Sequence, residues 1–279
     1  MSPPVDEGVE SAVPRLHRVW FTLGVLAGLF PAIAGPLAPA TLDKVFSWVA
    51  IPQLHARFIG GIYLFAVLYT LGCLVARRQW QTADAHWAIV IFTGLIGYLN
   101  LVNLDAFDFS LVAPKVWFAI YVVFPIAGVP IALAARRHSV EPATGGLRMA
   151  GWARVALRAQ AAVFALVGVV LLVDRQDAAR AWPWEASPNL VQFYSAAFLV
   201  FGFLSWRASV LRSWRAFATL VVPFAALGAS TVLSSLGRLD LFDADDLATW
   251  IWFGFFGAVA CSSLAMLAVM VRHRQFTAG

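Results

Sequence analysis

The amino-acid sequence predicts an all-α integral membrane protein whose eight transmembrane helices form two parallel four-helix repeats. Three observations support this fold class: an apolar composition, eight apolar stretches of spanning length, and matches that recur at a nearly constant offset. Hydrophobic residues make up 61% of the 279 residues and charged residues 13%, against about 45–50% and about 25% in soluble domains. The composition therefore excludes a disordered chain, a fibrous repeat and a water-soluble enzyme.

Each apolar stretch has the length of one membrane crossing, because a helix needs about 20 mostly apolar residues to span the hydrocarbon core. The stretches are continuously apolar, whereas the strands of a membrane barrel alternate over about 10 residues. The loops between them are too short for a water-soluble domain. The predicted spans are Val19–Pro39, Phe58–Ala76, Trp87–Leu104, Leu111–Ala135, Val155–Val173, Leu190–Trp206, Ala216–Leu236 and Ala248–Val271.

Basic residues divide unequally between the two sides of the predicted bundle. The side that holds both termini carries 14 of the 20 lysines and arginines, and the other side carries 6. Because cytoplasmic loops are enriched in Lys and Arg, both termini are predicted to be cytoplasmic. The formal charge of +5 is explained by this orientation, so no nucleic-acid partner is expected. A cleavable signal peptide over the first stretch is the alternative, and the acidic residues before that stretch disfavour it.

The sequence repeats itself at an offset of 135 or 136 residues. Each repeat holds four spans, an even number, so both repeats enter the membrane from the same side and are parallel. The predicted repeats are residues 1–140 and 141–279 of one integral membrane domain. The matching segments are Trp48-x-x-x-Pro52 with Trp184-x-x-x-Pro188, Leu104-Asp105-Ala106-Phe107-Asp108 with Leu239-Asp240-Leu241-Phe242-Asp243, Trp117-Phe118 with Trp252-Phe253, and Arg137-His138 with Arg272-His273.

The segment around the first match resembles a group of uncharacterised bacterial multi-pass membrane proteins. In that group a Trp-x-x-x-Pro segment precedes a helix that begins with an arginine and small residues, here Arg57, Gly60 and Gly61. The second half departs from this pattern, with Phe193 at the arginine position and two alanines for the glycines. The group has no assigned function, so the resemblance implies a multi-pass architecture and no activity.

Polar residues close the third and seventh spans on the outer side. Carboxylates at corresponding positions of the two repeats predict an acidic mouth that attracts or coordinates a cation. Two asparagines extend this polar face inward by helical spacing, and an arginine near the second span is a candidate for binding an anionic headgroup or substrate. The candidate vestibule consists of Asp105, Asp108, Asp240, Asp243, Asn100, Asn103, Arg238 and Arg57.

Each of these residues also has a structural interpretation. Aspartates before a helix accept hydrogen bonds from its free backbone donors, and Asp108 and Asp243 precede the fourth and eighth spans. Arg238 is positioned to neutralise the neighbouring carboxylates. Arg57 is able to extend to the interface or to pair with one of the aspartates of its own repeat.

Small and aromatic residues have predicted structural roles in the membrane. Gly24-x-x-x-Gly28, Gly60-Gly61 and Gly254-x-x-Gly257 are expected to allow close helix packing, because small residues let backbones approach in lipid. Tryptophans near span ends are typical of an aromatic belt at the membrane interface. The predicted belt contains Trp20, Trp48, Trp80, Trp182, Trp184, Trp214, Trp250 and Trp252.

The sequence predicts no cofactor and no metal site. Its five histidines are expected at the membrane interface without a ligand, and no paired-cysteine, HExxH, phosphate-loop or nucleophile-elbow motif is present. Enzymatic activity is therefore not expected. A membrane enzyme or haem carrier that uses histidines of the cytoplasmic side is the third hypothesis for function.

The first hypothesis is a carrier or channel for a small solute or ion, with the acidic mouth as its outward-facing vestibule. The second is a non-catalytic membrane scaffold or a subunit of a larger membrane complex. Its partners would be the lipid bilayer together with a membrane protein or a second copy of the chain. The alanine-, leucine- and arginine-rich composition, without an organelle-targeting pattern, predicts the bacterial plasma (inner) membrane.

Overall fold

The computed structural model describes residues 12–46, 51–136 and 147–273, and these residues form helices and no β-strand. The long helices are α1 (Arg15–Leu37), α3 (Gln53–Val75), α4 (Ala83–Val102), α5 (Val112–Arg136), α6 (Gly151–Val173), α8 (Pro188–Ser209), α9 (Ala218–Leu236) and α10 (Leu247–Arg272). The short helices are α2 (Pro39–Val45), α7 (Arg175–Arg180) and the 3₁₀ turns η1 (Gln79–Gln81), η2 (Leu104–Ala106) and η3 (Leu239–Leu241).

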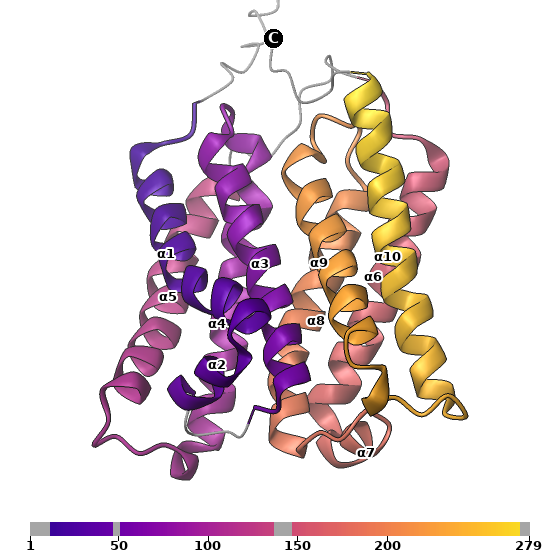
Figure 1. Ribbon diagram of the computed structural model, residues 1–279. Coiled ribbons are helices and arrows are strands. Elements are labelled where there is room, and N and C mark those ends of the chain that lie inside the picture. Colours follow the sequence, from indigo (N-terminus) through magenta and orange to yellow (C-terminus); the bar gives the residue numbers. More distant parts are fainter. Residues whose placement is uncertain (1–11, 47–50, 137–146, 274–279) are drawn as a thin grey trace, which may run out of the picture.

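Eight helices are long and apolar enough to cross a membrane, as the composition predicts. Their outer surface carries exposed leucine, valine and isoleucine side chains, which suits contact with lipid. Figure 1 shows that α1 and α6 begin at the same end of the bundle at which α5 and α10 finish. We call this the terminal end. The opposite end, which carries η2 and η3, is called the corner end.

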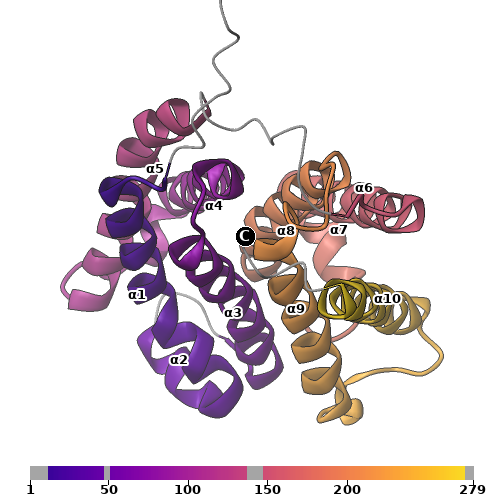
Figure 2. The same ribbon diagram turned by 90° about the horizontal axis from the view of Figure 1, so that it is seen from above.

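The helices pack in the same pattern in both halves of the chain. α1 packs along α3 and α4 along α5, while α6 packs along α8 and α9 along α10. The halves meet where α3 contacts α9 and α4 contacts α8. Viewed along the bundle, α1–α5 lie on one side and α6–α10 on the other (Figure 2). Helices α3, α4, α8 and α9 therefore form the centre of the molecule.

Side-chain contacts recur at the same offset as the sequence matches. The Trp117 indole donates to the Asn100 side-chain oxygen at 3.1 Å, and the Trp252 indole donates to the Ser235 hydroxyl at 3.0 Å. At the terminal end, isolated β-bridges join Ala12 to Arg78 and Arg148 to Ser213. These pairs tie equivalent elements of the two halves in the same way.

One of the three predicted glycine motifs marks a close helix crossing. A Cβ atom on Gly60 of α3 would lie 2.4 Å from the Pro36 ring of α1, and one on Gly35 would lie 2.6 Å from the Gly60 Cα. The prediction is wrong for Gly254 and Gly257, whose Cβ positions have nothing within 4 Å. These two glycines lie on the outer part of α10, where no described helix approaches them.

The predicted aromatic belt is largely part of the core instead. Trp250 is 64% exposed, as the belt requires, and Trp48 lies outside the described residues. The prediction is wrong for the tryptophans that pack against phenylalanines between the helices. The buried tryptophans are Trp20, Trp182, Trp184, Trp214 and Trp252.

Candidate functional site

The four aspartates of the predicted vestibule lie at the corner end, in two separate corners (Figure 1). All four are exposed. Asp108 accepts a hydrogen bond from the Ser110 backbone N–H at 2.8 Å, and Asp243 accepts one from the Asp245 backbone N–H at 2.9 Å. These bonds lie in the turns before α5 and α10. The predicted capping role of Asp243 is wrong, because α10 is capped by Asp246, whose carboxylate accepts from the Ala248 backbone N–H at 2.9 Å.

Arg238 neutralises Asp240, as the sequence suggests. Its guanidinium donates two hydrogen bonds of 3.0 Å to the Asp240 carboxylate, and these bonds lower the pKa of that carboxyl. Asp108 also has a lowered pKa, because the Ser110 hydroxyl and backbone N–H stabilise its charged form. Both groups therefore remain ionised at neutral pH, and Asp240 has its charge compensated within its own corner.

Two of the other polar candidates, Arg238 and Asn103, make contacts between the two halves. Arg238 donates to the Gln53 side chain on α3 at 3.5 Å. Arg175, on α7, donates at 3.4 Å to Asn103 of the first half and at 2.8 Å to Asn189 of the second. Arg238 thus lies where the end of α9 meets α3, and Asn103 lies where the end of α4 meets the second half near α8.

Asn100 and Arg57 also fall outside a shared vestibule. Asn100 is fully buried and holds the Trp117 indole. Arg57 is partly exposed, and its guanidinium lies near Gly237 at the end of α9, in the corner of the second half rather than beside Asp105 or Asp108. The eight candidates are therefore divided between two corners, and none of them lines the cavity described next.

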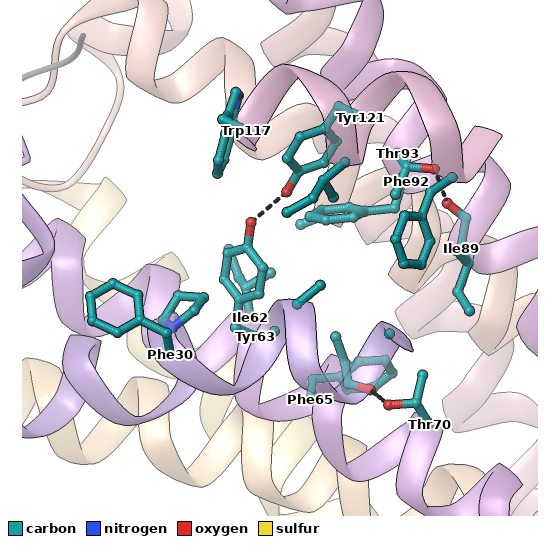
Figure 3. A pocket seen from close by; sticks show the side chains of 18 of the residues that line it. Phe30, Ile62, Tyr63, Phe65, Thr70, Ile89, Phe92, Thr93, Trp117 and Tyr121 are labelled. Carbon is teal, nitrogen blue, oxygen red and sulfur yellow. Dashed lines mark hydrogen bonds between the residues drawn. The ribbon is translucent and has the colours of Figure 1, made fainter. Parts of the chain in front are cut away.

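A cavity of about 530 Å³ lies inside the first half. Its walls come from α1 to α5, with α8 of the second half closing one side. Apolar residues make most of the lining, and among the described residues no aspartate, glutamate, lysine, arginine or histidine contributes to it. A largely apolar concavity with few polar groups is the usual form of a small-molecule site. Figure 3 shows the aromatic side chains around this space.

The corresponding space of the second half is filled by aromatic rings. Phe164 of α6 packs against Phe201 and Phe255, with ring centroids 5.2 Å and 4.8 Å away. At the offset of 136 residues, Gly28 of α1 occupies the position of Phe164. The first half therefore has a glycine beside its cavity at the position that the offset aligns with Phe164.

A second glycine enlarges the same space. Gly24 lines the cavity one helical turn from Gly28, and its counterpart at the same offset is Gln160. The Gln160 amide donates to Ser205 at 2.8 Å and fills the space between α6 and α8. Gly24 and Gly28 were expected to serve close packing, and the structure shows that both also border a cavity.

The cavity opens sideways between α1 and α5. The lining residues that are most exposed are apolar, namely Phe30, Val45, Val112 and Val116. α1 contacts α5 toward the terminal end, where the Trp20 and Phe124 rings are 4.7 Å apart, and the two helices diverge toward the corner end (Figure 1). In a membrane, this mouth faces lipid.

Two tyrosines meet inside the cavity. The hydroxyl of Tyr63 on α3 and that of Tyr121 on α5 are 2.5 Å apart and share a hydrogen bond (Figure 3). The lining threonines are already satisfied, because Thr70 donates to the Ala66 carbonyl and Thr93 to the Ile89 carbonyl. The tyrosine pair therefore provides the main polar contact available to a bound molecule.

The described histidines lie near helix ends, as the sequence predicts, but three of them are buried inside the bundle. His17, His55 and His86 are buried, His273 is exposed, and His138 lies outside the described residues. The rings of His17 and His86 touch, with centroids 4.4 Å apart. A haem plane does not fit between two rings in contact, so His17 and His86 do not form a bis-histidine haem site.

His55 joins the halves instead of binding a ligand. Its Nδ1 shares a hydrogen bond of 2.8 Å with the Tyr194 hydroxyl, and its Nε2 accepts one of 3.0 Å from the Trp184 indole. Nε2 also lies 2.9 Å from the Glu185 backbone carbonyl oxygen, so the ring has three polar contacts, all of them with residues of the second half. Within the described residues, no group of three or more His, Cys, Asp or Glu side chains is arranged to hold a metal ion.

Comparison of the chain with protein-family models, curated proteins and solved structures finds no match. The cavity, its mouth and its tyrosine pair are thus the features from which a function is inferred.

Proposed function

We propose that the chain is a multi-pass protein of the bacterial inner membrane, built from two parallel four-helix repeats with both termini cytoplasmic. The recurring sequence matches, the equivalent helix packing and the equivalent Trp117 and Trp252 hydrogen bonds support the duplication. The excess of basic residues at the terminal end supports the orientation. The resemblance to uncharacterised bacterial membrane proteins is consistent with this architecture.

The orientation can be tested by labelling single cysteines from outside the cell. In a chain without its native Cys73 and Cys261, Ser110→Cys and Ala244→Cys place one thiol in each corner, and Gly151→Cys places one at the terminal end. We expect a membrane-impermeant maleimide to label both corner thiols in intact spheroplasts and to reach the α6 thiol only after permeabilisation. Labelling of the two corners from opposite sides would refute the parallel repeats.

We further propose that the first repeat binds a small apolar molecule taken from the bilayer. The observation that carries this proposal is the cavity of about 530 Å³ whose exposed rim residues are all apolar. A polar solute would have to enter through lipid to reach such a site, whereas an apolar molecule is already dissolved there. The proposal keeps the hypothesis of a small-solute carrier and moves its site from the acidic corners to the first repeat.

The alternatives remain predictions. An ion vestibule requires the corner aspartates to converge, and a scaffold or complex subunit requires no ligand at all. Binding of an apolar probe distinguishes the proposal from a pure scaffold, because the scaffold hypothesis predicts no saturable binding to the first half.

Filling the cavity should abolish binding. We expect Gly28→Phe, which introduces the ring found at Phe164 and whose Cβ would displace the Val67 methyl 3.1 Å away, to weaken binding of diphenylhexatriene to the purified protein at least about tenfold. Gly24→Leu is the second variant, because its Cβ would lie 3.5 Å from Thr70, an ordinary contact. Titration of probe fluorescence in detergent micelles measures the dissociation constant.

Gly254→Leu is the matched control, since it makes the same kind of change on the outer part of α10. It should bind the probe like the original chain. If folded Gly28→Phe and Gly24→Leu both bind as tightly as this control, the cavity is not the binding site and the proposal fails.

A further inference from the structure

We infer that the cavity selects a neutral apolar molecule with one carbonyl-type hydrogen-bond acceptor, which the Tyr63–Tyr121 pair binds. This inference rests on the proposed function, because it names the class of ligand for the same cavity. It concerns ketones, esters and quinones that dissolve in the bilayer. The juxtaposition that carries it is a pair of hydroxyls from α3 and α5 inside an otherwise apolar cavity.

The ligand is neutral because the cavity has nothing to balance a charge. In the part of the chain that the structure describes, no charged side chain and no histidine line it, and transferring an unpaired ion into such surroundings is strongly unfavourable. A fatty-acid carboxylate or a quaternary amine would therefore remain at the membrane surface.

The number of hydroxyl hydrogens in the tyrosine pair indicates that the ligand carries a hydrogen-bond acceptor. Two tyrosine hydroxyls carry two hydrogens, and the bond between Tyr63 and Tyr121 uses one of them. Among the described residues, neither hydroxyl has another hydrogen-bond partner. One O–H donor of the pair is therefore free, and a buried donor without an acceptor is costly. A carbonyl oxygen on the ligand would satisfy it.

The surroundings of the pair favour a flat group next to the acceptor. The Trp117 ring lies 4.5 Å from the Tyr121 ring, and the Phe92 ring lies 6.2 Å from the Tyr63 ring. Figure 3 shows the two hydroxyls directed toward one another with Trp117 beside them. The Trp117 indole N–H is already donated to Asn100, so it offers the ligand an aromatic face and no competing donor.

Tyr69 is the main competitor for this role. It also lines the cavity, and its hydroxyl has no hydrogen-bond partner among the described residues. However, it lies near enough to Asp84 and Arg207 for an electrostatic interaction, which places it toward the terminal end and away from the lipid-facing mouth. The Tyr63–Tyr121 pair is better placed, because Tyr121 belongs to the helix that forms one side of that mouth.

A matched pair of probes tests the inference on the full chain. Dodecanophenone carries a ketone on an apolar body, and dodecylbenzene has nearly the same body without the acceptor. We expect dodecanophenone to displace diphenylhexatriene with an affinity about fivefold to tenfold higher than that of dodecylbenzene, the effect of one net hydrogen bond. The double variant Tyr63→Phe with Tyr121→Phe should bind both probes equally. Tyr98→Phe, a change on the exposed surface of α4, should keep the preference.

The outcomes separate this inference from the proposed function. If neither probe binds, the proposed function itself fails. If both bind equally to the original chain, or if the preference survives in the double variant, the cavity binds apolar molecules but the tyrosine pair does not select them. Loss of the preference in Tyr69→Phe with retention in the double variant would assign the acceptor to Tyr69 instead and overturn the inference.

Infrared spectroscopy of a probe bound to the original chain tests the inference even if the double variant does not fold. The carbonyl stretch of ¹³C-labelled dodecanophenone bound to the original chain should lie at lower frequency than in dodecane, as a hydrogen-bonded carbonyl requires. A stretch at the dodecane position would overturn the inference. A labelled ester and a labelled quinone, examined in the same way, distinguish a lipid ester from a quinone as the natural source of the carbonyl.

Discussion

Replacing Gly60 by leucine is expected to destabilise the protein more than any other single change considered for this chain. A Cβ at this position would lie 2.4 Å from the Pro36 ring and 3.0 Å from the Gly35 backbone. Neither a proline ring nor a backbone can rotate aside, so α1 would have to separate from α3. We expect the free energy of unfolding to fall by about 3 kcal/mol, measured by denaturant titration in detergent micelles.

The control for this prediction is Gly254→Leu, which adds the same side chain where no described atom lies within 4 Å. It should leave the unfolding midpoint almost unchanged. Equal midpoints for the Gly60 and Gly254 variants would show that α1 and α3 do not cross as closely as described. Gly60→Ala should lie between the two, because its single methyl still meets the Pro36 ring.

Removing the His55 imidazole should be the second most damaging change. In His55→Leu, the Tyr194 hydroxyl and the Trp184 indole both lose a partner inside the core. Each buried polar group left unpaired costs about 1–3 kcal/mol, and at the low end of that range two such groups give a loss of about 2 kcal/mol in the free energy of unfolding. Because His55 belongs to α3 while both partners belong to the second half, the loss should also weaken the contact between the halves.

Tyr194→Phe is the graded comparison, since it removes only the contact between His55 and Tyr194 and leaves those with Trp184 and the Glu185 carbonyl. It should cost less than the leucine variant, about 1 kcal/mol. Limited proteolysis of the chain between α5 and α6 provides a second measurement, and faster cleavage is expected in His55→Leu than in the original protein. A leucine variant as stable as the original would show that the hydrogen bonds of His55 do not hold the halves together.

The transmembrane helices could be predicted from sequence because their signal is strong and local. The predicted span Val155–Val173 ends at the same residue as α6, and the other predicted spans overlap their helices over most of their length. The short helices α2 and α7 were not predicted, because six or seven residues without an apolar run carry no such signal. Their positions depend on packing against α3 and α8.

The cavity could not be predicted in the same way, because it results from missing side chains rather than from a motif. Gly24 and Gly28 were visible in the sequence, and small residues in a membrane helix ordinarily indicate close packing. One signal was present, namely the offset that aligns Gly28 with Phe164. It indicates a difference in volume between the halves, but only the structure shows that no other side chain fills the space.

The vestibule was predicted from polar residues at corresponding positions of the two repeats, which were expected to lie near one another. Asp105 and Asp240 lie in the corresponding turns η2 and η3 of the two halves. The neutralisation of Asp240 by its sequence neighbour Arg238 was predicted, whereas the contacts of Asn103 and Arg238 with Arg175 and Gln53 of the opposite halves were not. Such pairings depend on side-chain reach across helices that are distant in sequence.

The sideways opening of the cavity changes what selectivity means for this protein. A molecule leaving the site passes into hydrocarbon instead of water, so dehydration of its apolar surface contributes little to holding it there. Discrimination then falls to the fit of its shape and to single polar contacts, and the abundance of each candidate in the bilayer weighs as much as its intrinsic affinity. Occupancy would consequently follow the lipid composition of the cell rather than the concentration of any compound in its surroundings.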